Sequence, residues 1–308
     1  MLLKKLEETA RSCGCRVEEA EPMAAHTSFK IGGPADLYIE APNGLAAAAV
    51  VKLCRESGIP LLLIGNGSNM LVGDGGVRGA VLRLSGGDAA PGVMGKTADG
   101  GVLVACPAGL SLKRLCLFAR ENGLSGLEFA YGIPATVGGA VFMNAGAYGG
   151  EMRDVLQSAE AFLPDGTAVD IPAENMKLSY RHSVFMENGG VVTAAVVALH
   201  PDDAEAVGGR MEEFLRRRKE KQPLEYPSAG SFFKRPPGHF AGTLIEKSGL
   251  KGCRIGGAQV SEKHAGFLIN RGGATCEDVR RLAVHVQETV LTRHGVRLEP
   301  EVRFVGEP

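Results

Sequence analysis

Apolar and polar positions alternate along the chain in a way that predicts helices and strands in succession. Residues 44–57 place apolar side chains at helical spacing, with Asn43 as N-cap and a glycine just past the end. The apolar run 59–64 that follows predicts a strand buried on both faces. The loop GNGSN at 65–69 and the apolar residues 70–72 complete an α/β unit.

The same alternation continues to the C-terminus, and it predicts a mixed α+β fold without repeats or long linkers. The last helix, 276–294, begins with Thr275 and Asp278 at capping-box spacing. The tail alternates as a strand over 296–306. The other predicted elements are a strand at 102–106, a helix at 111–122 with Ser111 as cap, a strand at 191–197, a charged helix at 204–221 and a strand at 265–270.

Composition narrows the class of protein. The 308 residues are 44% hydrophobic and 22% charged with a net charge of −1, which is typical of an ordinary globular protein and excludes a dedicated nucleic-acid binder. Apolar runs stop well short of the roughly 20 residues of a membrane helix, and the start lacks a signal peptide's pattern. Seven cysteines, an odd number, indicate a reducing cytoplasm, and Cys13 and Cys15 lack the partners of a zinc site. We therefore expect a cytoplasmic protein without a metal.

The loop 65–69 follows a predicted buried strand, where α/β proteins often bind ligands. Its glycines let backbone N–H groups converge on an anion such as a diphosphate. A dinucleotide fingerprint of the Rossmann type would require a third glycine at Met70 and a following helix, and neither is present. An anion site and a simple tight turn are equally compatible with these five residues.

The stretch GIPATVGGAVFMNAGAYGGE at 132–151 contains too many glycines for one regular element. Asn144 and Tyr148 supply polar groups among its small residues. This stretch could be a glycine-rich hairpin that packs against a neighbouring domain. Two such loops in one chain favour a nucleotide-like cofactor.

Three places in the sequence carry candidates for chemistry. Ser231 lies between small residues, but no histidine or lysine is spaced to make it a nucleophile. Arg181 lies among residues that are expected to be half-buried, where an arginine needs a carboxylate, a phosphate or a structural ion pair. In the tail strand, Glu299, Glu301 and Arg303 share one face, which a solvated salt bridge would also explain.

An arginine, a carboxyl group and an unactivated serine suit one type of reaction. The arginine and a protonated glutamate stabilise negative charge that develops beside a carboxylate. The serine then donates one proton as a general acid. The strand face does not distinguish Glu299 from Glu301.

Seven segments in order resemble the UDP-N-acetylenolpyruvoylglucosamine reductase family over nearly the whole chain. The resemblance implies a flavoenzyme of peptidoglycan synthesis in which NADPH reduces non-covalent FAD, which then reduces the enolpyruvyl ether of UDP-N-acetylglucosamine enolpyruvate to UDP-N-acetylmuramate. The segments are HTSFKIGG (26–33), GNGSN (65–69), GIPATVGGAVFMNAGAYGGE (132–151), LSYRHSVF (178–185), SAGSFFKRP (228–236), LIEKSGLKGCRIGGAQVS (244–261) and LEPEVRF (298–304).

The resemblance also implies roles for residues. Arg181 and Glu301 would stabilise the intermediate and Ser231 would protonate it. For the substrate we consider Tyr148 and, for its diphosphate, Arg218, Lys221 and Lys234, although a solvated basic face also explains these basic residues. The cofactor would be bound by Lys30, Gly65, Asn66, Gly67, Ser68, Asn69, Pro134, Ala135, Thr136, Gly138, Gly139, Asn144, Gly146 and Ala147.

The implied fold is a two-part FAD-binding domain of the vanillyl-alcohol-oxidase (PCMH) type with a smaller α+β substrate domain. The FAD subdomains would be 1–85 and 86–202, the substrate domain 203–295, and the tail strand 296–308 would be able to pair back into the first. The chain lacks the extra tyrosine-bearing segment that one branch of the family carries between Arg181 and Ser231, so it resembles the shorter type, and we expect a monomer.

Two other readings stay open. A related flavoprotein oxidase of the same fold would act on another substrate, and His26 is the nearest candidate for tethering its flavin. A non-catalytic nucleotide-sugar binder would hold no FAD.

Overall fold

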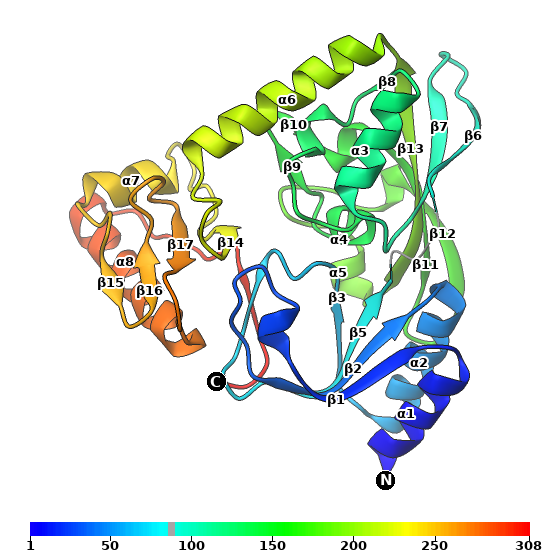
Figure 1. Ribbon diagram of the computed structural model, residues 1–308, viewed down its shortest axis with the longest axis horizontal. Coiled ribbons are helices and arrows are strands. Elements are labelled where there is room, and N and C mark those ends of the chain that lie inside the picture. Colours follow the sequence, from blue (N-terminus) through cyan, green and yellow to red (C-terminus); the bar gives the residue numbers. More distant parts are fainter. Residues whose placement is uncertain (86–89) are drawn as a thin grey trace. The chain divides into compact units, whose positions relative to one another are not determined.

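The computed structural model describes residues 1–85 and 90–308, and it divides them into two units (Figure 1). Unit 1 comprises Met1–Glu19, Leu37–Asn66 and Gly79–Arg217, and unit 2 comprises Ala20–Asp36, Gly67–Arg78 and Arg218–Pro308. Both units are therefore assembled from segments far apart in sequence. The predicted boundary at 85/86 adjoins residues 86–89, which lie outside the described residues.

The first sheet has the strand order β1-β2-β5-β3, and β3 runs parallel to β5. Helices α1 and α2 bury Leu6 and Val50 in one core with strand residues such as Ile39. Helix α2 is confirmed, because the Asn43 side chain accepts from the N–H of Ala46. The elements are α1 (Leu2–Ser12), β1 (Arg16–Pro22), β2 (Pro34–Ala41), α2 (Gly44–Ser57), β3 (Leu61–Ile64) and β5 (Val77–Leu84).

The prediction of a strand over residues 59–64 that is buried on both faces is wrong in both the length and the burial of the strand. It covers only β3, and Leu61 to Leu63 are half-buried. The reason is its position at an edge of the four-stranded sheet, where one side has no strand neighbour.

The second sheet belongs to unit 1 and is antiparallel, in the order β12-β11-β13-β7-β6 with β8 paired to β13. Helix α3 begins at the predicted cap, Ser111, whose side chain accepts from Arg114 N–H. Helices α3 and α4 pack their apolar residues into this core. The elements are β6 (Gly92–Lys96), β7 (Val102–Pro107), α3 (Leu112–Glu121), β8 (Leu124–Ser125), α4 (Val137–Phe142), β11 (Leu156–Phe162), β12 (Ala168–Pro172) and β13 (Val191–Pro201).

Unit 2 contains an antiparallel sheet, β14-β17-β16-β15, packed with α7 and α8 around one core. Helix α8 has the predicted bounds and the predicted capping box of Thr275 and Asp278. Helix α6 also has the predicted bounds, and its last turn belongs to unit 2. The elements are α6 (Ala204–Lys221), β14 (Ser228–Ser231), α7 (Ala241–Lys247), β15 (Arg254–Ile255), β16 (Ala258–Val260), β17 (Phe267–Asn270) and α8 (Cys276–His294).

The tail strand is shorter than its alternation predicts. Only β18 (Arg303–Val305) is a strand, and it pairs in parallel with β4 (Met70–Val72) in unit 2. Leu298 and Val302 are buried, but Phe304 is 43% exposed. Phe304 lies on β18, and the residues before Arg303 are not part of that strand.

The remaining elements are short. No helix within residues 1–85 and 90–308 is long and apolar enough to span a membrane. The short elements are η1 (Met23–Ala25), η2 (Glu128–Ala130), β9 (Gly146–Ala147), β10 (Gly150–Glu151), η3 (Met152–Asp154), η4 (Ala173–Asn175) and α5 (Phe185–Asn188).

Candidate active site

Two of the predicted cofactor loops meet inside unit 1. Asn66 Nδ2 donates to the carbonyl of Pro134 at 3.4 Å. A Cβ atom on Gly65 would lie 2.5 Å from Thr136 Oγ1, so only glycine allows this approach. Arg83 reaches Asn66 Oδ1 at 3.3 Å and holds the same side chain from the other direction. The loops at 65–66 and 134–136 therefore form one surface.

The glycine pair Gly138 and Gly139 lies at the start of α4. Thr136 caps this helix by accepting from the Gly139 N–H at 3.2 Å. A Cβ atom on Gly138 would lie 2.8 Å from Ala108 Cβ, and the Gly138 N–H donates to the Ala108 carbonyl at 2.8 Å. The pair thus has a packing role beside any contact with a ligand.

The rest of the GNGSN loop belongs to unit 2. Gly67 has φ +58°, and a Cβ there would lie 2.2 Å from the His26 carbonyl oxygen. Its own carbonyl accepts from the Ser28 N–H at 3.1 Å, which places the segment of Lys30 beside it. His26 Nε2 lies 2.7 Å from Glu21 Oε1, so this ring nitrogen is engaged by a carboxylate.

The residues of these loops fit an FAD. A dinucleotide diphosphate binds to clustered backbone N–H groups and hydroxyl or amide donors on loops without bulky side chains. Within unit 1, the Asn66 amide and the Thr136 hydroxyl are groups of this kind, and Gly65 brings no side chain between the two loops.

Arg181 lies at the tip of a two-residue turn in unit 1. Reciprocal backbone bonds close the turn, from Ser179 N–H to the His182 carbonyl at 3.2 Å and from His182 N–H to the Ser179 carbonyl at 3.1 Å. Arg181 has φ +55°, a conformation that non-glycine residues adopt rarely and often at functional sites. Its side chain is half-buried as predicted, and its guanidinium carbon lies 5.1 Å from the Tyr180 ring centroid.

A charged cluster supports this turn from its flank. Glu187 accepts from Lys177 Nζ at 2.6 Å and lies 3.3 Å from His182 Nε2. The hydrogen bond from Lys177 is the main reason that the pKa of the Glu187 carboxyl is lowered, and the positive charge of Lys177 adds to it.

Asn144 was expected to bind the cofactor, but its side chain is fully buried. Its amide nitrogen donates to Glu151 Oε2 at 3.0 Å and to the Ser179 carbonyl at 3.1 Å. Its amide oxygen accepts from the Arg153 N–H at 2.9 Å. This burial argues against direct contact between the Asn144 side chain and a ligand.

Tyr148 lies at the turn of the β9–β10 hairpin. Tyr148 and Gly149 have φ +54° and +89°, as in the two-residue type I′ turn of tightly twisted hairpins. The Tyr148 ring stacks on Phe214 of α6 with centroids 4.8 Å apart. Phe214 is a residue that the sequence analysis missed. Its signal is an aromatic ring in an otherwise charged helix.

Ser231 and Glu301 are brought together inside unit 2. Ser231 ends β14, which has a register shift containing Gly230 at φ +80°. The next residue, Phe232, is buried, and its carbonyl accepts from the Glu301 N–H at 2.8 Å. The serine hydroxyl is exposed and the Glu301 side chain half-buried.

Asn69 supports the same tail segment from a second side. Its Nδ2 donates to the Glu301 carbonyl at 3.2 Å, and its carbonyl accepts from the Arg303 N–H at 3.1 Å. The last residue of the GNGSN loop therefore positions the tail, which the sequence analysis did not predict.

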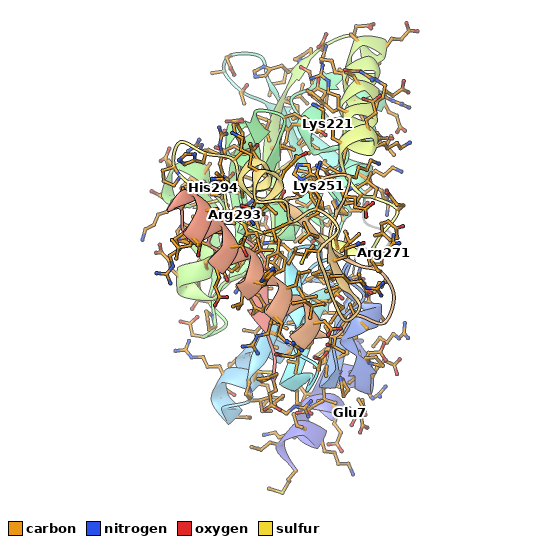
Figure 2. The ribbon with its side chains drawn as sticks, turned by 90° about the vertical axis from the view of Figure 1, so that its left-hand side faces the viewer. Glu7, Lys221, Lys251, Arg271, Arg293 and His294 are labelled. Carbon is orange, nitrogen blue, oxygen red and sulfur yellow. The ribbon has the colours of Figure 1, made fainter. Side chains whose placement is uncertain are left out.

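The other tail glutamate has a different environment. Glu299 is 68% exposed and lies 3.3 Å from Lys234 Nζ in an ion pair. Lys234 therefore forms an ion pair with Glu299. Lys221, at the end of α6, is labelled in Figure 2, and its side chain is exposed. Arg218, one turn earlier, is half-buried. The exposed ion pair favours Glu301 over Glu299 as a functional carboxyl group.

Two models of known protein families match this chain. An FAD binding domain model matches residues 35–172. The model described as UDP-N-acetylenolpyruvoylglucosamine reductase, C-terminal domain, matches residues 222–305.

Individual relatives match almost the full length. The UDP-N-acetylenolpyruvoylglucosamine reductase of Lachnoclostridium phytofermentans is 47% identical over 95% of this chain and 94% of its own. That of Streptococcus agalactiae is 44% identical over 99% of both. The crystal structure of UDP-N-acetylenolpyruvylglucosamine reductase from Thermus caldophilus is similar with a TM-score of 0.80 and 38% identity, covering 94% of this chain and 99% of that one.

Proposed function

The chain belongs to the UDP-N-acetylenolpyruvoylglucosamine reductase family, and from this premise we propose that it reduces UDP-N-acetylglucosamine enolpyruvate to UDP-N-acetylmuramate with NADPH. The chain has the two domains of this family, an FAD-binding domain and a separate C-terminal domain. The relatives' shared name and nearly complete coverage favour this reaction over an oxidase or a non-catalytic binder. The monomeric state, the cytoplasmic location and the three predicted domain boundaries stay predictions.

FAD, when bound, supplies the hydride that it has taken from NADPH to the β-carbon of the enolpyruvyl ether. We propose that Gly65, Asn66 and Thr136 bind its diphosphate region, because these residues already form one surface with hydrogen-bond donors. His26 is engaged by Glu21, which supports a non-covalent cofactor.

The chain's own residues handle the charge and the proton. Hydride addition at the β-carbon leaves an electron pair on the α-carbon, delocalised into the adjacent carboxylate. Arg181 would bind this carboxylate with two parallel N–H donors, and Glu301 in its protonated form would donate a further hydrogen bond. The Ser231 hydroxyl would then transfer its proton to the α-carbon and complete the reduction.

The observation that carries this assignment is the backbone bond between Phe232 and Glu301. It joins the backbone of the residue after the proposed proton donor to the backbone of Glu301, which carries the proposed charge-stabilising carboxyl group. Arg181 lies in unit 1, and its strained turn indicates a positioned functional group.

The test is a visible absorption spectrum of the purified protein. We expect flavin absorption that NADPH bleaches and that the enolpyruvyl substrate restores under anaerobic conditions. Colour that stays with the denatured protein would indicate a covalent flavin and support an oxidase. A colourless protein that binds no FAD would contradict any flavoenzyme, and bleaching without recovery on substrate addition would contradict this substrate.

A further inference from the structure

Asn144 lies where three parts of unit 1 meet. It follows α4, and its fully buried side chain contacts the β9–β10 hairpin through Glu151 and the start of η3 through Arg153. Its third bond goes to the carbonyl of Ser179, which is the first residue of the turn that contains Arg181. One side chain therefore connects the hairpin that carries Tyr148 with the turn that carries Arg181.

The chemistry of an amide is required at this position. The Asn144 amide nitrogen donates to two acceptors, the Glu151 carboxylate and the Ser179 carbonyl, while its oxygen accepts from the Arg153 N–H. Among side chains of this size, only asparagine supplies two donors and an acceptor. The backbone favours the same residue, because Asn144 has φ +41° and asparagine tolerates the left-handed region.

The neighbouring contacts fix the other end of the same turn. Ser183 is buried and donates through its hydroxyl to the Phe142 carbonyl at 2.7 Å. The residues on both sides of the turn are thus attached to the C-terminal end of α4. The Ser179 carbonyl also closes the turn by accepting from the His182 N–H. Asn144 therefore donates to the same carbonyl oxygen that closes the turn.

We propose that Asn144 is a positioning residue for Arg181, and that it acts through the Ser179 carbonyl. It sets the orientation of the guanidinium toward the substrate carboxylate without touching substrate or cofactor. This inference rests on the proposed function, since it requires that Arg181 act in reoxidation of the flavin by substrate.

The primary variant is Asn144→Asp, which keeps shape but removes both donors. We expect flavin content and reduction by NADPH to stay within about 2-fold of wild type, because the Asn144 side chain is fully buried. Reoxidation by the enolpyruvyl substrate should fall about 10- to 100-fold, because the Ser179 carbonyl loses its bond from residue 144 and the new carboxylate lies beside that of Glu151. Product binding to the flavin-free protein, measured by calorimetry, should weaken in the same direction.

A double-mutant cycle with Arg181→Ala separates positioning from general damage. If Asn144 acts through Arg181, Asn144→Asp should add less than about 2-fold to the loss in Arg181→Ala. Fully additive losses would overturn the proposal. If Arg181→Ala itself reoxidises normally, the proposed function fails at Arg181, which is a different result from failure of Asn144→Asp alone.

A reversed pair tests whether the bond to Glu151 is what matters. In Asn144→Asp with Glu151→Gln, the glutamine amide can donate to the new carboxylate, but the Ser179 carbonyl still lacks the bond from residue 144 and keeps only that from the His182 N–H. We expect the melting temperature to recover and the reoxidation rate to stay low. Recovery of both would assign Asn144 a purely structural role and overturn the proposal.

Asn122→Asp is the matched control, because Asn122 Nδ2 also donates to a backbone carbonyl, that of Phe118 at 2.8 Å, at the exposed end of α3. Its half-reactions should equal those of wild type. An equal loss in both variants would show a nonspecific effect of the added charge and contradict the proposal. If Asn144→Asp does not fold, Asn144→Gly, which accepts the same φ, takes its place with the same expectations.

Discussion

The Arg181 turn, which its own backbone bonds close, is attached to the rest of unit 1 by side chains, whereas the main link between the Ser231 and Glu301 segments is a backbone bond. Side chains support the turn, with Asn144 bonded to Ser179 and Glu187 to Lys177 and His182. In unit 2 a bond between two backbone groups, the Phe232 carbonyl and the Glu301 N–H, connects the pair.

The difference determines how easily each group can be displaced. A side-chain support disappears with one substitution, whereas a backbone bond survives almost any change of residue identity. The position of Arg181 should therefore be sensitive to residues that never touch the ligand. Ser231 and Glu301 should tolerate such changes and lose function mainly when their own side chains change.

The largest effect is expected from Ser231→Ala. The exposed hydroxyl has no packing role, so folding, flavin content and reduction by NADPH should stay near normal. Reoxidation by substrate should fall roughly 10²- to 10⁴-fold, the range for loss of a general acid. Stopped-flow absorbance of both half-reactions measures this. Equal losses in the two half-reactions would contradict the role of proton donor.

A smaller effect is expected from Asn69→Ala, which tests the backbone-held region. The variant loses the bond from Nδ2 to the Glu301 carbonyl, worth about 1 kcal/mol, while the Phe232 bond remains. Reoxidation should therefore fall less than about tenfold, compared with the larger loss for Asn144→Asp. A loss of 10²-fold or more with full flavin content would remove the contrast between the two regions. Lost flavin would support the predicted contact of Asn69 with the cofactor.

The smallest effect is expected from Glu187→Gln, and it depends on pH. The pKa of Glu187 is lowered in the folded protein by Lys177, so its stabilisation is present above the unfolded value of about 4.3. It is lost as pH falls through the lower folded pKa. The melting temperature of the variant should lie no more than about 2 °C below wild type near pH 7, and the difference should shrink as the pH falls below about 4.3.

Glu56→Gln is the control for this series, since Glu56 forms an exposed pair with Lys52 at 3.9 Å on α2, away from the Arg181 turn. It should leave reoxidation unchanged at pH 7. A pH-independent difference for Glu187→Gln would show that its charge does not stabilise the turn.

Local signals in the sequence were sufficient for several elements. The caps Asn43, Ser111 and Thr275 and the bounds of α6 and α8 were predicted, because capping and helical periodicity depend on neighbours along the chain. The seven motifs also identified the family. They could do so because their order is a property of the sequence itself.

The sequence did not determine what depends on distant partners. The run 59–64 gave no sign that β3 would be an edge strand, and the tail gave no sign that its strand would begin only at Arg303. The burial of Asn144 and its bond to Ser179, 35 residues away, was equally hidden. Sequence alone thus determined the helices, the family and the candidate residues. Only the tertiary structure decided which of them are held by side chains and which by backbone, because those bonds join segments that are remote along the chain.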